Sequence, residues 1–182
     1  RIMVREDLGE PFPPGTLRWT CESAFDGLRD RTIVVPGVRT DWIVAVHGHG
    51  SHDDQLFTRA DIRRYRLPRM LKSGMGILSP NLRDNAWMSP AAVRDLHGLL
   101  GLMRAEFGAR RFFFFSGSMG GASNLYYALQ HPDDVAALVA LGAAGLWATV
   151  VILTGYQLGL VAGAIGILIG LAVRKGSGGT GG

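Results

Sequence analysis

The sequence predicts an α/β fold, in which a mostly parallel sheet is flanked by helices and followed by a C-terminal hydrophobic segment. Several short runs are continuously apolar, which is typical of strands buried on both faces of a sheet. These runs alternate with stretches of helical periodicity, as parallel strands joined by crossover helices require. The chain has 182 residues, and no Asp, Glu, Lys or Arg occurs from 135 to 173. We therefore divide it into an α/β domain over 1–142, a transmembrane segment over 145–173 and a flexible glycine-rich tail over 174–182.

The elements of the α/β domain follow one another in the order that such a sheet needs. Residues 1–30 are mostly polar, and the stretch from Pro11 to Gly15 predicts a turn or an extended entry. Ser89 and Pro90 predict a helix start, because serine caps a helix and proline fits its first turn. The predicted strands are 31–38, 41–46, 76–80, 111–115 and 135–141. The predicted helices are 56–73, 90–107 and the stretch from the turn at Ser118 to about 130.

A serine flanked by small residues lies between the strand 111–115 and the helix that follows it. The stretch reads Ser116-Gly117-Ser118-Met119-Gly120-Gly121. A nucleophile elbow needs small neighbours, because the chain turns sharply from strand to helix and holds the serine hydroxyl above the strand ends. Ser118 is therefore the candidate nucleophile. The N–H of Met119, at the start of the helix, is a candidate donor to an acyl oxyanion. We assign the second donor to the N–H of His49, in the loop after an earlier strand.

Three segments carry a resemblance to a known family: the loop HGHG after DWIVAV, the stretch GILSPNLRDNAWMSPAAVRDLHGLL, and the stretch RFFFFSGSMGGASNLYYALQHPDDVAALVAL. Through them, residues 30–142 resemble the N-terminal portion of the α/β-hydrolase family, in its esterase- or lipase-like form. The resemblance implies an α/β-hydrolase fold that is incomplete here. It implies Ser118 as nucleophile, with backbone donors from Met119 and the His49 region. The implied substrate is a small carboxylic ester or acyl compound, and no cofactor is implied.

The acid and the base of this family are not in their usual place. In α/β-hydrolases an Asp or Glu and then a His follow the nucleophile along the chain. The histidine and acids that follow Ser118 are only His131, Asp133 and Asp134. They stand at the far end of the helix that begins at the nucleophile, on the order of 18 Å away. We therefore expect a truncated or fused serine hydrolase that is inactive or weakly active.

The loop His47-Gly48-His49-Gly50-Ser51-His52-Asp53 also has two other interpretations. One of its histidines could serve Ser118 as a general base. Alternatively, His47, His49 and His52 resemble the zinc motif of metallo-β-lactamase-fold hydrolases, in which alternating histidines after a strand converge on one ion. Ser51 stands where that motif has an Asp, and no further histidine series follows. A zinc-dependent hydrolase is therefore an alternative function.

The uncharged segment predicts a membrane anchor. The stretch GLWATVVILTGYQLGLVAGAIGILIGLAVRKGSGG is similar to the helical hairpin of a family of small bacterial integral membrane proteins, and it is long enough for one span or a short hairpin. Gly155, Gly159 and Gly163 recur at helical spacing and would allow self-association of helices. Arg174 and Lys175 predict a cytoplasmic C-terminus, in a bacterial inner membrane.

Composition excludes several other classes of protein. The apolar content of 47% and the single cysteine rule out disordered chains and disulfide scaffolds. The net charge of +4 includes a basic helical stretch from Arg59 to Lys72, which we interpret as a solvated helix face, and no nucleic-acid-binding motif accompanies it. A non-catalytic membrane protein, whose soluble part binds or scaffolds a partner, is the remaining alternative to an enzyme.

Overall fold

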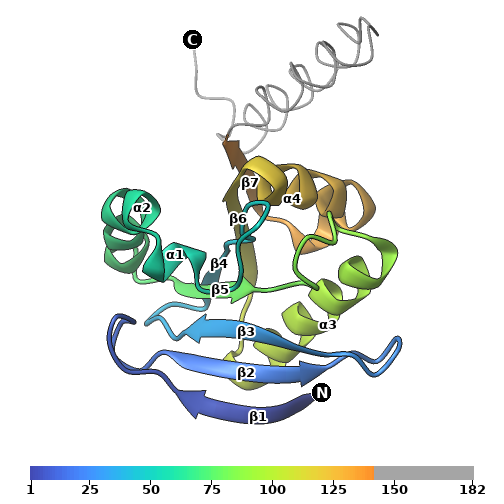
Figure 1. Ribbon diagram of the computed structural model, residues 1–182, viewed down its shortest axis with the longest axis horizontal. Helices are drawn as coiled ribbons and strands as arrows, with labels where there is room; N and C mark the ends of the chain where they lie inside the picture. The colour runs from blue at the N-terminus through green and yellow to red at the C-terminus, as the bar shows by residue number, and fades with distance from the viewer. Residues whose placement is uncertain (142–182) are drawn as a thin grey trace, which may run out of the picture. The chain divides into compact units, whose positions relative to one another are not determined.

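The computed structural model describes residues 1–141, which form a seven-stranded sheet with helices on both faces (Figure 1). The strand order is β1-β2-β3-β5-β4-β6-β7. The strands are β1 (Ile2–Asp7), β2 (Leu17–Glu22), β3 (Arg29–Val35), β4 (Asp41–Val44), β5 (Gly76–Pro80), β6 (Arg111–Gly117) and β7 (Ala137–Leu141). The helices are α1 (Gln55–Thr58), α2 (Ala60–Lys72), α3 (Pro90–Phe107) and α4 (Ser118–Gln130), with a 3-10 turn, η1 (Pro132–Asp134).

The sheet is mixed, with a parallel half and an antiparallel half. β5, β4, β6 and β7 run parallel to one another, which confirms the parallel sheet expected from the apolar runs. β1, β2 and β3 are antiparallel neighbours, and β3 joins the parallel half through an antiparallel pairing with β5. The sequence analysis missed β1 and β2. Their residues are mostly half-buried or exposed, so they lack the continuous apolar run of a central strand.

Two apolar cores lie on opposite faces of the sheet, because alternate residues of each strand point to opposite sides. On one face, Phe112 and Phe114 of β6 pack with α3, α4 and Trp42. On the other face, α1 and α2 cover β4 and β5, with Ile43 and Ile77 at the centre. Figure 1 shows α1 and α2 on the opposite side of the sheet from α3 and α4.

The helix signals were confirmed for α3 and corrected for the helix predicted over 56–73. In α3 the Ser89 hydroxyl accepts a hydrogen bond from Ala92 N, Pro90 is the first helical residue, and Gly108 ends the helix at φ +61°. The helix predicted over 56–73 is instead two helices, α1 and α2. Arg59 lies between them with an extended backbone, φ −78° and ψ 111°, which interrupts the helical hydrogen bonding.

The predicted transmembrane segment over 145–173, its contact glycines and the tail over 174–182 lie outside the described residues and stay predictions. Within residues 1–141, no helix is both long enough and apolar enough to cross a bilayer.

Candidate functional site

Ser118 lies at an abrupt turn between β6 and α4. β6 ends at Gly117 and α4 begins at Ser118, whose φ is +54°. A non-glycine residue in the left-handed region costs on the order of 1 kcal/mol and persists only where its surroundings impose it. The side chain is exposed, although Ser116 and Met119 on either side of the turn are buried. The turn expected at Ser118 is thus present, with the serine presented to solvent.

The turn is clamped to the end of β4 by two neighbours of Ser118. A β-carbon on Gly120 would lie 2.2 Å from the Val46 carbonyl oxygen, so only glycine lets α4 begin this close to the chain after β4. The Ser116 hydroxyl accepts a hydrogen bond from Val46 N at 2.8 Å and another from Asn124 Nδ2 at 2.8 Å. Ser116 therefore ties β6 to α4 and to the chain just after β4. From the sequence, Ser116 is only one of the small residues around Ser118.

The loop after β4 lies against the same turn. A β-carbon built on Gly48 would lie 3.8 Å from Ser118 Cβ, and Gly48 and His49 line the pocket that Ser118 lines. The Gly48 N–H is occupied, since it donates to Gln55 Oε1 at 2.9 Å. The N–H of His49 has no hydrogen-bond acceptor within residues 1–141. Of the two loop amides beside Ser118, that of Gly48 is thus taken by Gln55, a residue not singled out from the sequence, and that of His49 has no acceptor in the described part of the chain.

The three histidines of this loop point to different partners. His47 is buried, with Nδ1 2.8 Å from Gly48 O and Nε2 2.8 Å from Asn81 O. His52 Nδ1 lies 3.0 Å from Asp84 Oδ1, and the His49 ring lies 6.0 Å from that of Trp87. The ligand atoms of the three rings are not gathered around one point among the described residues, and the geometry does not support the zinc alternative.

The upstream acids also differ in their surroundings. Asp53 is buried, with Oδ2 3.5 Å from Arg18 Nε and Oδ1 3.9 Å from Arg31. Its burial raises the carboxyl pKa above the ordinary value, against the opposing effect of the two arginines. Asp84 is exposed, and hydrogen bonds from Asn81 and His52 lower its pKa. Among the described histidines of the loop after β4, His52 is thus the one that pairs with an aspartate.

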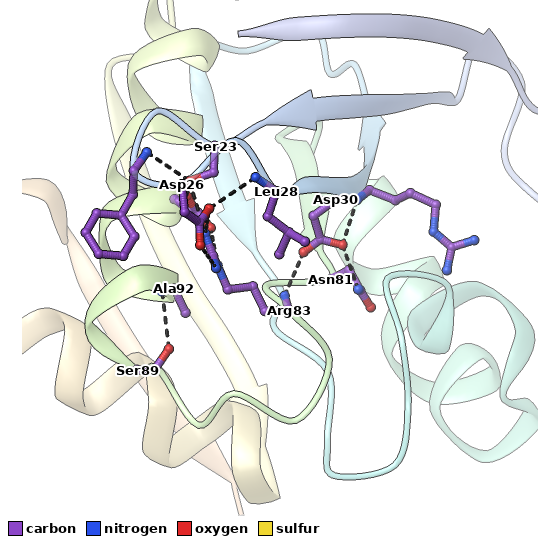
Figure 2. Close-up of polar contacts among 11 residues, drawn as sticks. Ser23, Asp26, Leu28, Asp30, Asn81, Arg83, Ser89 and Ala92 are labelled. Carbon is purple, nitrogen blue, oxygen red and sulfur yellow. Dashed lines mark hydrogen bonds and ion pairs between the residues drawn. The ribbon is translucent and has the colours of Figure 1, made fainter.

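A network of ion pairs fixes the loop that carries Asp84 (Figure 2). Leu82, Arg83 and Asp84 have φ values of 48°, 61° and 56°, three successive residues in the left-handed region. The Arg83 guanidinium donates to Asp95 Oδ2 at 2.6 Å and to both oxygens of Asp26 at 2.7 and 2.8 Å. The Asp30 carboxylate accepts from Arg83 N and from Asn81 Nδ2. These contacts hold the strained turn, and none of them was foreseen from the sequence.

The residues that follow Ser118 lie at the other end of α4, as the helix length requires. His131 follows the last residue of α4, and its ring stacks on those of His97 and Tyr127 at 4.8 and 4.9 Å. The Asp134 carboxylate accepts from Arg104 at 2.6 Å, from Tyr127 at 2.7 Å, and lies 2.9 Å from His97 Nδ1. Within residues 1–141 no histidine nitrogen hydrogen-bonds the Ser118 hydroxyl.

His97, His131 and Asp134 form a group of potential metal ligands whose ligand atoms lie within 4.8 Å of one another. Both Asp134 oxygens already accept hydrogen bonds from protein donors. Burial alone would raise the pKa of Asp134, but the hydrogen bonds from Tyr127, Arg104 and His97 outweigh it and lower the pKa. The group therefore has the character of a polar network that joins α3 to the end of α4.

Ser118 opens onto a pocket of about 310 Å³. Its walls come from the chain after β4, from α1 and α2, and from the end of β6. Apolar side chains such as Leu56, Ile62, Met70 and Phe115 form much of the surface. An exposed serine, a facing-loop amide without an acceptor in residues 1–141, and an adjacent pocket with both polar and apolar walls could together hold an acyl group against a nucleophile.

Several solved structures have a fold similar to that of this chain. FphF, a fluorophosphonate-binding serine hydrolase of Staphylococcus aureus, is 16% identical with a TM-score of 0.57, and the match covers 68% of this chain and 55% of FphF. Epoxide hydrolase A of Mycobacterium thermoresistibile is 21% identical with a TM-score of 0.51, and the match covers 68% of this chain and 38% of that one. MPT51 (FbpC1) of Mycobacterium tuberculosis is 13% identical with a TM-score of 0.58, and the match covers 76% of this chain and 50% of that one. The chain thus spans between 38% and 55% of the length of these structures. No curated protein matches it.

The match to a family profile extends beyond the described fold. The profile for serine aminopeptidases, S33, matches residues 40–166, which are 127 of the 182 residues. This match includes the strand before the HGHG loop, Ser118 and α4, and it continues past residue 142, where the sequence analysis ended the α/β domain. The chain therefore belongs to the serine aminopeptidase S33 family of α/β-hydrolases.

Proposed function

We propose that Ser118 is the nucleophile of a carboxylic-ester hydrolase and that the N–H groups of Met119 and His49 bind the oxyanion. The observation that carries the proposal is the strained, exposed conformation of Ser118 at the start of α4. In the reaction, Ser118 Oγ bonds to the ester carbonyl carbon and the carbon–alkoxide bond breaks. The alkoxide leaves with a proton, and water then releases the acid. Both amide donors would meet the carbonyl oxygen as its negative charge develops.

We expect slow turnover from the 182-residue chain tested by itself, because within residues 1–141 no histidine nitrogen hydrogen-bonds the Ser118 hydroxyl. Removing a triad member from a serine hydrolase removes most of the catalysis, yet the oxyanion hole and substrate binding leave a residual rate. We therefore expect slow acylation of Ser118 without efficient turnover. Within the described residues the His52–Asp84 pair is the group most like the missing half of a triad, but no hydrogen bond connects it to Ser118.

Labelling with a fluorophosphonate probe tests the nucleophile directly, since this probe phosphonylates an activated serine without needing turnover. The folded chain is expected to be labelled at Ser118, and both Ser118→Ala and the heat-unfolded chain are expected to remain unlabelled. Equal labelling of the folded and unfolded chains, or of Ser118→Ala, would remove the proposal. An unlabelled folded chain would favour the non-catalytic alternative.

An assay with p-nitrophenyl acetate and butyrate tests the expected low rate. Turnover is expected at least tenfold below the value of about 10 s⁻¹ that is ordinary for enzymes. Turnover in the ordinary range that is lost in Ser118→Ala would show that the chain supplies a working base. The variants His52→Ala and His49→Ala would then identify which upstream histidine provides it.

A further inference from the structure

Part of the basic surface of α2 faces the pocket beside Ser118. The sequence predicts that the basic stretch from Arg59 to Lys72 is a solvated helix face. The structure confirms this for Arg63 and Arg64, which are exposed. Arg59 and Arg66, in contrast, line the same pocket as Ser118. Two cationic side chains are therefore available to whatever occupies that pocket.

The two arginines differ in how their charge is balanced. Arg59 Nε lies 2.9 Å from Asp61 Oδ1, so this pair contributes no net charge to the pocket wall. Arg66 is half-buried, and its guanidinium carbon lies 5.5 Å from the centre of the Phe115 ring. Among residues 1–141, no carboxylate lies within ion-pair distance of Arg66. Arg66 is thus a cation packed on an aromatic ring, with its charge uncompensated in the described part of the chain.

The remaining wall limits what the cation can bind. Besides Arg66 and the Arg59–Asp61 pair, the pocket wall includes apolar side chains from α1, α2 and β6, among them Leu56, Ile62 and Phe115. An apolar wall selects methylene groups, and a guanidinium fork selects a planar anion such as a carboxylate. A substrate that matches both would have an apolar chain with a carboxylate at one end and the ester at the other.

We propose that the pocket selects esters whose acyl group ends in a carboxylate, the half-esters of dicarboxylic acids, and that Arg66 is the residue that recognises that carboxylate. The inference rests on the proposed function of Ser118. We assign the carboxylate to the acyl half because this half stays bonded to Ser118 after the alcohol leaves. The contact with Arg66 would then hold the substrate through both acylation and deacylation.

Binding measured in the Ser118→Ala background tests the inference without any turnover. Monomethyl glutarate and monomethyl adipate carry the carboxylate, and their dimethyl esters are the neutral counterparts. Isothermal titration is expected to show at least about tenfold tighter binding of the half-esters, since a charge-assisted hydrogen bond contributes about 1.5–3 kcal/mol. The preference should weaken as salt is raised, because Arg66 is only half-buried.

Three further variants locate the selectivity. Arg66→Gln is expected to remove the preference for the half-ester, Arg66→Lys to retain part of it, and the matched control Arg63→Gln, on the exposed face of α2, to leave it unchanged. Equal binding of half-esters and diesters, or a preference that survives Arg66→Gln, would overturn the inference. Absence of Ser118 labelling by the fluorophosphonate, together with an Arg66-dependent preference, would refute the proposed nucleophile and leave an anion-binding pocket.

Discussion

Replacing Gly120 with alanine tests whether the elbow depends on the close approach of α4 to the end of β4. The new β-carbon would lie 2.2 Å from Val46 O and 2.7 Å from His47 O. A normal carbon–oxygen contact is about 3.3 Å, so the start of α4 would have to retreat by about 1 Å. Overpacking of this kind costs about 1–3 kcal/mol. For a chain of this size we expect a Tm lowered by roughly 2–12 °C in a thermal unfolding scan followed by circular dichroism.

Gly101→Ala is the matched control. Gly101 is exposed on α3, and a β-carbon there would meet no atom within 4 Å. Alanine is the better helix former by about 0.5–1 kcal/mol, so this variant should be more stable than the wild type, by roughly 1–4 °C in Tm. Replacing glycine with alanine is thus expected to lower the Tm in α4 and to raise it in α3. A Gly120→Ala protein as stable as the wild type, beside a stabilised Gly101→Ala, would refute the close packing of α4 on the chain after β4. Fluorophosphonate labelling of Ser118 should slow in Gly120→Ala and stay unchanged in Gly101→Ala.

Three other predictions concern groups away from Ser118. Asp134→Asn should lower the free energy of unfolding in urea by about 1–3 kcal/mol at pH 7 through weaker hydrogen bonds from Arg104 and Tyr127. Since the folded-state pKa of Asp134 is lowered, the wild-type advantage should be complete above the ordinary aspartate pKa of about 4 and should decline as the pH falls through that lowered pKa. An advantage that does not decline on acidification would contradict this. Burial raises the pKa of the Cys21 thiol to about 11. Iodoacetamide at pH 8 should therefore alkylate Cys21 roughly 100-fold more slowly in the folded chain than in urea, because less of the thiol is ionised. Equal alkylation rates in the two states would contradict this. Arg83→Met should cost about 2–3 kcal/mol and expose the turn that follows β5 to limited proteolysis, whereas an intact, protease-resistant turn would show that the ion pairs do not hold it.

The parallel half of the sheet and the position of the elbow were predictable from the sequence because they depend on local patterns. The run from Phe112 to Phe115 is apolar on both faces, and this favours a central strand with helices on either side. Ser89 and Pro90 set the start of α3 through their own capping chemistry. Small residues around Ser118 marked a sharp turn, since larger ones could not be accommodated there.

The contacts that complete the site were decided by the tertiary structure. The Ser116 hydroxyl accepts a hydrogen bond from Val46 N, 70 residues away in the sequence, and no local pattern relates the two residues. The Gln55 side chain accepts a hydrogen bond from the Gly48 N–H only because α1 folds back over the loop. Likewise, a basic helical stretch has the same periodicity whether its arginines face solvent or a pocket, and the packing of α2 against β6 decides that Arg66 lies over Phe115. A sequence records which turns and faces the chain can form, whereas long-range hydrogen bonds and pocket walls depend on which segments the sheet order brings together.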